Sequence, residues 1–205
     1  MNILREEMKK IQRAYYFAEN TSYNIKIKST GEIKEDCQAT KFIYYQMVFN
    51  MIYDKFRGKS VKAKITNLIS WFERKKVFFQ ELVGEINEAD YATLQNIITD
   101  KNIEEDEKSN FLKIIKKVSN DDENEELLKE EVIEIFSFIN KVRNNFFHGT
   151  KKAQEALEAG QEERFYIYSR ILSNLIKAFI KIEGIDLSEE DLEDSLRENL
   201  GFLRR

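Results

Sequence analysis

The stretch most able to do chemistry is Lys141–Gly149, with the sequence Lys-Val-Arg-Asn-Asn-Phe-Phe-His-Gly, which holds the only histidine of the chain. Arg143 supplies a cation that cannot lose its charge, and His148 supplies a proton donor or acceptor that works near neutral pH. Asn144 and His148 are four positions apart, so they are neighbours on one flank of a helix. Together the three side chains could bind a phosphodiester and move a proton.

The residues before this stretch predict a long amphipathic helix. Its apolar positions recur every three or four residues and define one face, made of Val132, Ile135, Phe136, Ile139, Val142 and Phe146. Arg143 falls near the middle of that face. A guanidinium there is costly unless a buried carboxylate pairs with it or it faces a groove that receives anions. The structural alternative is therefore that Arg143 forms a salt bridge inside a bundle and that His148 only caps the helix before Gly149.

The segment Arg143-Asn144-Asn145-Phe146-Phe147-His148 resembles the Arg, four to six residues, His signature of the HEPN superfamily. About ninety residues earlier, the aromatic run from Phe42 to Tyr53 ends in Phe49-Asn50-x-x-Tyr53 and is similar to the first core helix of the Apea-like branch. The resemblance covers roughly Cys37 to Gly184. It implies an up-and-down helical core and a metal-independent ribonuclease site that two subunits form together.

The resemblance also implies roles for the signature residues. Arg143 would bind and stabilise the scissile phosphate, His148 would transfer the proton, and Asn144 would orient the histidine or the RNA. One histidine can supply a general base or a general acid but not comfortably both, so a homodimer that brings two signature helices together would complete the site. The products would carry a 2′,3′-cyclic phosphate and a 5′-hydroxyl, and no cofactor would be needed.

Composition predicts an all-α protein with one domain over residues 1–205. The chain has no proline, where average usage would give about 10. We expect a helical core at about 37–184, an N-terminal helix and irregular segment at 1–36, and a C-terminal capping helix at 186–205. The single cysteine, Cys37, agrees with a reducing compartment, and no stretch approaches the ~20 apolar residues of a membrane span. These features favour a cytoplasmic protein without a membrane segment.

Charge is distributed unevenly along the chain. Residues up to Gly84 include 16 basic and 9 acidic side chains, against 17 and 28 in the rest. The densest basic cluster runs from Lys55 to Lys76 and could contact phosphates, although a solvated helix face would look the same. Lys151 and Lys152, just after the signature, are further candidates for RNA binding. The acidic runs are typical of first helical turns, and neither calcium-loop nor zinc-ligand spacing is present, so we expect no metal site.

The remaining patterns predict helices at about 2–18, 36–56, 61–72, 77–86, 87–98, 104–118 and 165–184. The acidic run Asn120–Glu126 is predicted to open the signature helix. Residues 20–35 differ, because Tyr23–Lys28 alternates polar and apolar side chains. This segment could be a short strand, with no obvious partner, or an ordered loop.

Two classes of function follow from these observations. The first is a HEPN-type endoribonuclease, for which the resemblance implies a role in defence or in a toxin–antitoxin pair with an antitoxin or other regulatory protein. The second is a non-catalytic helical module that binds RNA, a nucleotide or a protein partner.

Overall fold

The computed structural model describes residues 5–20, 25–26, 33–34, 38–97, 103–120, 126–147 and 162–184; for the strands and for residues 96, 97 and 145–147 it describes the backbone only. These residues form eight helices and one two-stranded hairpin. The helices are α1 (Arg5–Asn20), α2 (Gln38–Tyr53), α3 (Val61–Arg74), α4 (Phe79–Val83), α5 (Glu88–Ile97), α6 (Glu105–Ser119), α7 (Lys129–Phe147) and α9 (Glu162–Glu183). The strands are β1 (Ile25–Lys26) and β2 (Ile33–Lys34).

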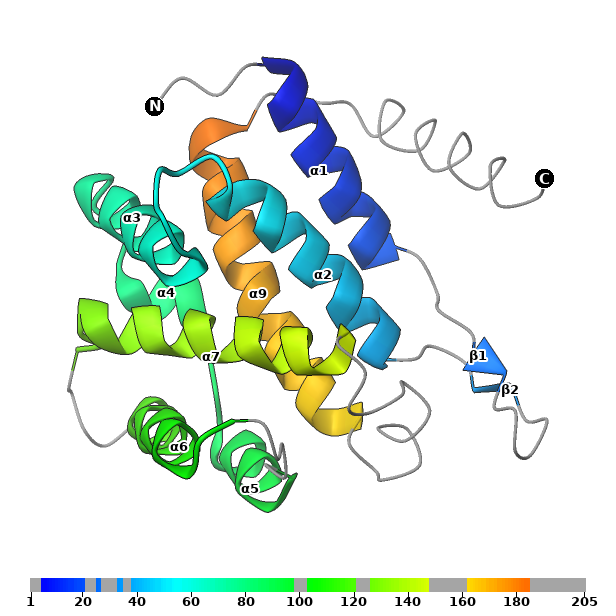
Figure 1. Cartoon of the computed structure of the whole chain (residues 1–205), viewed down its shortest axis with the longest axis vertical. Helices are drawn as coiled ribbons and strands as arrows, with labels where there is room; N and C mark the ends of the chain where they lie inside the picture. The colour runs from blue at the N-terminus through cyan, green and yellow to red at the C-terminus, as the bar shows by residue number, and fades with distance from the viewer. Residues whose placement is uncertain are drawn as a thin grey trace.

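The helices form a bundle that α7 crosses. Helices α1, α2 and α9 run side by side along the length of the molecule, and α7 lies across them (Figure 1). Helix α3 packs on α7, α4 packs mainly on α9, and α5 contacts both α9 and α6. The prediction of an all-α bundle is confirmed. No helix in the described part of the chain is both long enough and apolar enough to span a membrane.

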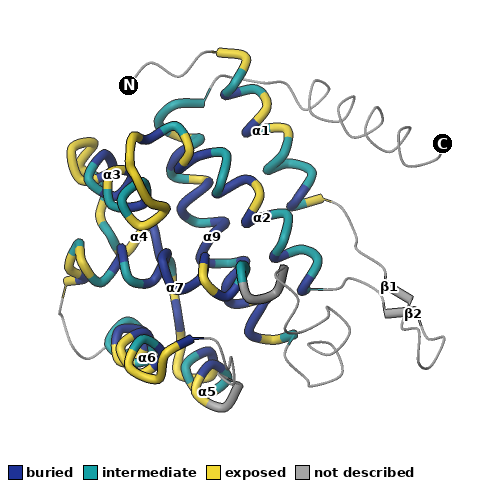
Figure 2. The backbone as a smooth tube through the Cα atoms, viewed as in Figure 1, coloured by how far each residue is buried: buried dark blue, intermediate teal, exposed yellow. Residues whose placement is uncertain are grey.

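The core lies where α2, α7 and α9 meet (Figure 2). Along α2 and just beyond its end, the apolar side chains at helical spacing are buried, namely Phe42, Tyr45, Phe49, Ile52 and Phe56. Aromatic rings join the three helices: Phe49 lies 5.6 Å from Phe136 of α7, and Phe42 lies 5.3 Å from Phe165 of α9, between ring centroids. Burying a side chain of this size contributes about 1.5–3 kcal/mol, so this three-helix junction holds much of the stability of the fold.

Two local predictions need correction. The strand alternative for residues 20–35 has a partner after all, because Ile25 pairs with Lys34 and Lys26 with Ile33 in an antiparallel hairpin. The signature helix starts later than predicted, at Lys129, and the acidic residues of its first turn are Glu130 and Glu131. The carboxylate of Glu131 accepts a hydrogen bond from the backbone nitrogen of Leu128 at 2.7 Å, which satisfies a donor at the start of α7. This carboxylate therefore does the capping that the run Asn120–Glu126 was expected to do.

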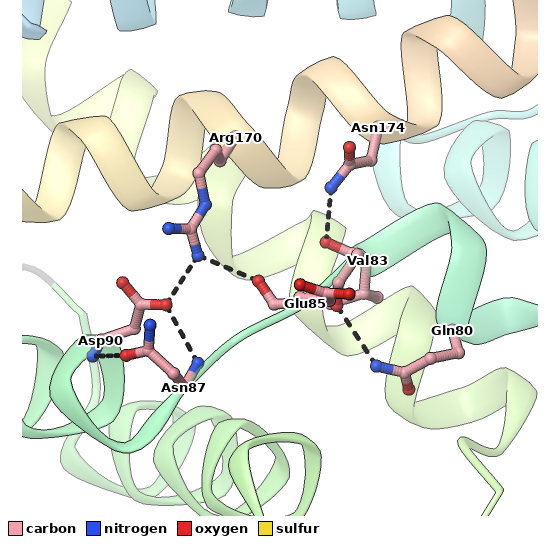
Figure 3. A network of polar contacts seen from close by, with 8 residues as sticks. Gln80, Val83, Glu85, Asn87, Asp90, Arg170 and Asn174 are labelled. Atoms are coloured by element: carbon pink, nitrogen blue, oxygen red, sulfur yellow. Dashed lines mark hydrogen bonds and ion pairs between the residues drawn. The ribbon is translucent and has the colours of Figure 1, made fainter.

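A set of polar contacts from α9 holds the connection between α4 and α5 (Figure 3). Arg170 donates to the Asp90 carboxylate at 2.6 Å and to the Glu85 carbonyl at 2.9 Å. Asn87 and Asp90 exchange side-chain and backbone hydrogen bonds of 2.9 and 3.0 Å. This reciprocal pair caps the start of α5.

Gly84 lets the chain turn close to α9. Its φ of 79° and ψ of −170° belong to a region that residues with a side chain rarely adopt. A Cβ atom at this position would lie 1.9 Å from the amide nitrogen of Asn174, which donates to the Val83 carbonyl at 3.1 Å. Only glycine fits both the backbone angles and the space.

We expect Gly84→Ala to lower the free energy of unfolding by about 1–3 kcal/mol, through backbone strain and the clash with Asn174. Urea denaturation of both proteins measures this difference. In a protein that also carries Asn174→Ala, the clash is absent. There Gly84→Ala should lower the free energy of unfolding only by the cost of the positive φ. A Gly84→Ala protein as stable as wild type would contradict this account.

A hydroxyl-rich cluster around Glu19 ties α1 to its neighbours. Glu19 accepts hydrogen bonds from Tyr15, from Ser173 of α9 at 2.8 Å, and from Tyr45 of α2. Burial by itself raises the pKa of Glu19, but the hydrogen bonds from the three hydroxyls and the charge of Lys177 outweigh it, and the pKa is lowered. Burial and the bond to Glu19 raise the pKa of Tyr15. The cluster is thus built around an ionised Glu19.

Because the pKa of Glu19 is lower in the folded than in the unfolded protein, its contribution to stability is complete above the usual glutamate value of about 4.3. The contribution is lost as the pH falls through the folded pKa. We expect Glu19→Gln to lower the free energy of unfolding by about 1–2 kcal/mol at pH 7 and to reduce its fall between about pH 5 and 3. Urea denaturation across this range, with the exposed Glu85→Gln as control, tests this; parallel pH profiles for wild type and Glu19→Gln would refute it.

Candidate functional site

The candidate site begins at the C-terminal end of α7. The five described positions of the predicted apolar face are all buried, namely Val132, Ile135, Phe136, Ile139 and Val142. Arg143 follows directly and is half-buried, with its Nε atom fully enclosed. The structure therefore places a guanidinium at the edge of the core, in the last turns of a helix that is otherwise mostly buried.

Asn144 contacts this guanidinium. The Nη1 atom of Arg143 donates to the Asn144 side-chain oxygen at 2.9 Å. Adjacent residues point about 100° apart around a helix, so this bond links the core side of α7 to the next side. The sequence assigned Asn144 to the histidine or to a substrate, and the structure adds a role toward Arg143.

Helix α2 packs against α7 and brings two polar side chains to that contact, of which only Tyr53 is close to Arg143. Tyr53, at the end of α2, is buried, and this burial together with the charge of Asp54 raises the pKa of its hydroxyl while the charge of Arg143 opposes the rise. Gln46 is completely buried and donates to the Ile139 carbonyl at 3.3 Å. The Phe-Asn-x-x-Tyr segment and the signature helix are thus in contact.

Several buried oxygens where α2 meets α7, and along α7, have no hydrogen-bond partner among the described residues. On α2 these are the side-chain oxygens of Gln46 and Asn50, and on α7 those of Ser137 and Asn140. Each such atom costs about 1–3 kcal/mol relative to a paired one. The hydroxyls of Thr66, Ser70 and Ser169 avoid this cost by bonding the carbonyl one turn back in their own helices, but that of Ser137 does not.

A groove lies between α3, α6 and α7, with a volume of about 220 Å³. Its α7 side includes Ser137, Asn140, Lys141 and Asn144, so the amide that orients Arg143 also borders the groove. Ion pairs cross it, from Lys62 to Glu134 at 2.5 Å and from Lys141 to Glu107. The groove therefore combines balanced charges with buried polar atoms.

The basic cluster Lys55–Lys76 is about half neutralised. Lys55 pairs with Glu7, Lys62 with Glu134, Lys64 with Asp54 and Lys75 with Glu183. The exposed side chains of Arg57, Lys59, Arg74 and Lys76 form no ion pair with another described residue. Phosphate binding would thus depend on these four cations more than on the cluster as a whole.

Four residues predicted from the sequence lie outside the described residues: His148, Gly149, Lys151 and Lys152. The C-terminal helix at 186–205 does so too. Helix α7 ends at Phe147, so His148 is the next residue of the chain. In the described ranges, no three His, Cys, Asp or Glu side chains gather as metal ligands would.

Sequence reasoning missed the polar side chains around the signature. Ser137 and Asn140 were overlooked because a polar residue of an amphipathic helix usually faces solvent. Their spacing from Asn144 was the available signal, because residues three, four and seven apart share a helix face.

Comparisons with models of protein families, with curated proteins and with solved structures found no match to this chain. The case for a function therefore rests on the sequence motif and on the geometry around Arg143.

We expect Gln46→Leu to leave the free energy of unfolding unchanged or to raise it by about 1 kcal/mol. The replacement removes a buried unpaired oxygen and loses only the long hydrogen bond to Ile139. Thermal and urea denaturation measure the effect. A loss above about 2 kcal/mol would show that Gln46 has a partner of real strength, and Gln46→Ala, which leaves a cavity, sets the scale for simple loss of packing.

Proposed function

We propose that the protein is a metal-independent endoribonuclease whose active site forms where the C-terminal ends of two α7 helices meet in a homodimer. The observation that carries this proposal is the placement of Arg143. Its half-buried guanidinium is hydrogen-bonded to Asn144 at the end of α7, five positions before the only histidine of the chain. Holding a cation in a fixed direction at a helix end prepares it to stabilise charge that develops on a phosphate.

The reaction uses the RNA's own 2′-hydroxyl as nucleophile. A base removes the 2′-hydroxyl proton while the 2′-oxygen bonds to the adjacent phosphorus, and an acid protonates the departing 5′-oxygen as its bond to phosphorus breaks. Arg143 stabilises the negative charge on the pentacoordinate phosphorus group. The products are a 2′,3′-cyclic phosphate and a 5′-hydroxyl, and DNA, which lacks the 2′-hydroxyl, is not cut.

The count of histidines is the argument for two subunits. The chain has one, and the reaction needs a base and an acid at the same time. In a twofold dimer, His148 can serve as one and the partner subunit's His148 as the other. A role in defence or as a toxin restrained by an antitoxin follows from the HEPN resemblance, as a further part of this proposal.

A second candidate is a helical module that docks a protein partner. The ion pairs that neutralise half of the basic cluster favour it, because they lower the attraction for a polyanion. Under this reading, changes at Arg143 and His148 would leave partner binding intact.

We expect wild-type protein to cleave an end-labelled structured RNA in excess EDTA and His148→Ala to be slower by about 100-fold or more, since proton transfer by a positioned side chain contributes at least this much. Gel analysis of the labelled fragments and of their termini gives both rate and chemistry. Arg143→Lys should also lose activity, because a lysine keeps the charge but not the fixed fork of donors.

Arg170→Lys is the matched control for Arg143→Lys. Arg170 is a partly exposed arginine paired with Asp90 on another side of the bundle, so its replacement should change stability and not chemistry. All proteins are first compared for folding and for mass in solution. Equal cleavage by wild type and His148→Ala, or products that end in a 3′-hydroxyl, would overturn the proposal; a monomer that cleaves would overturn the composite site.

A further inference from the structure

The groove between α3, α6 and α7 contains two buried polar groups that the fold does not use. Asn140 is 5% exposed and Ser137 is 9% exposed, and both line the groove. Their side-chain oxygens find no hydrogen-bond partner among the described residues. An oxygen of this kind is costly in a folded protein unless something binds it. A ligand that brings hydrogen-bond donors to these two positions would remove the cost.

The other walls of the groove define what such a ligand looks like. Phe111 of α6 and Phe138 of α7 line it, and their rings stack at 4.0 Å with an interplanar angle of 8°. Lys62 and Lys141 are each paired with a glutamate at the groove, so its charges balance. The site therefore suits a flat, neutral group with apolar faces and polar edges better than it suits an anion.

The size of the groove points to a single such group. A volume of about 220 Å³ is below the roughly 300–1,000 Å³ of sites that enclose a drug-sized molecule. An unpaired nucleobase matches each feature: its faces stack on apolar surface, and its edge presents amino and imino donors to oxygens such as those of Ser137 and Asn140.

The groove also leads toward the signature. The carbonyl of Ile139 contacts α2. Ser137 and Lys141 are each two positions from Ile139, which is about 160° around the helix axis. The groove therefore lies on the side of α7 opposite to α2. Asn144 borders the groove and holds Arg143. Helix α3 runs antiparallel to α7, because Lys62 pairs with Glu134 and Glu73 pairs with Lys129. The N-terminal end of α3 is therefore the end nearer the signature. Arg57 and Lys59 lie in the turn just before that end.

We infer that this groove binds one unpaired base of the RNA, next to the phosphate that Arg143 holds. The inference rests on the proposed function for the identity of the ligand, and it adds the determinant of base preference. Ser137 and Asn140 read the edge of the base, and Phe111 and Phe138 provide its apolar wall. Arg57 and Lys59 are the exposed cations placed to contact the flanking backbone.

Binding is tested without cleavage by titrating AMP, CMP, GMP and UMP separately into ¹⁵N-labelled protein and following backbone amide shifts, with ribose 5-phosphate as the ligand that lacks a base. We expect at least one nucleotide to shift the amides of Ser137 and Asn140, and ribose 5-phosphate to leave them unmoved. Asn140→Leu and Ser137→Ala should weaken this binding at least tenfold. Ser137→Ala removes a single oxygen and cannot block the groove, so it covers the case in which Asn140→Leu fails to fold.

Gln46→Leu is the matched control, because it also removes a buried unpaired amide oxygen but on the α2 side of α7, away from the groove. It should leave nucleotide binding unchanged. In cleavage assays, Ser137→Ala should raise KM and weaken base preference with little change in kcat, unlike His148→Ala. Shifts that are equal for ribose 5-phosphate, or that persist in both groove variants, would overturn the inference. If the protein cleaves RNA but no nucleotide shifts the amides of Ser137 and Asn140, the base-binding groove is refuted and the proposed nuclease activity stands. If nucleotides bind in the groove but RNA is not cleaved, the nuclease activity is refuted and the base-binding groove stands.

Discussion

The burial of α7 is the constraint on which the rest of the structure depends. From Val132 to Val142 this helix is buried at every position except Glu134 and Lys141, because α2 covers one side and α3 and α6 cover others. A helix enclosed in this way can carry polar side chains only where a partner or a cavity receives them. A polar residue of α7 therefore marks a partner or a cavity, whereas a polar residue of a surface helix can simply face solvent.

Two partly buried arginines show how the same side chain serves different ends. Arg170 donates to the Asp90 carboxylate and to a backbone carbonyl, so its charge is compensated where it lies and it fastens α5 to α9. Arg143 donates to the side-chain oxygen of Asn144, its neighbour in the last turns of α7. The first set of contacts ties two helices together, and the second lies within one helix end.

Much of the fold could be predicted from the sequence, because long helices carry a strong periodic signal. The inner face from Phe42 to Phe56 and the buried face of α7 were both readable at helical spacing. The alternation of Tyr23–Lys28 allowed a strand, but its partner Ile33–Lys34 could not be recognised, because a strand of two residues is too short to show a pattern. The start of α7 was misplaced because a run of acidic residues marks a helix start only to within a turn or two, and the cap that Glu131 forms decides the position.

The contact at the centre of the candidate site is local in sequence, and its surroundings depend on tertiary packing. Arg143 and Asn144 are adjacent in sequence, so their partnership needs no tertiary information, whereas the approach of Tyr53 and the groove depend on how α2, α3 and α6 pack against α7. This division has a physical consequence for catalysis. A phosphate can be held by residues of one helix end, but selection of a base requires walls from several helices, and the walls here carry paired charges. Under the proposed function, the groove would admit a neutral base while Arg143 receives the phosphate. Affinity for RNA and preference for a base would then arise at neighbouring positions of α7.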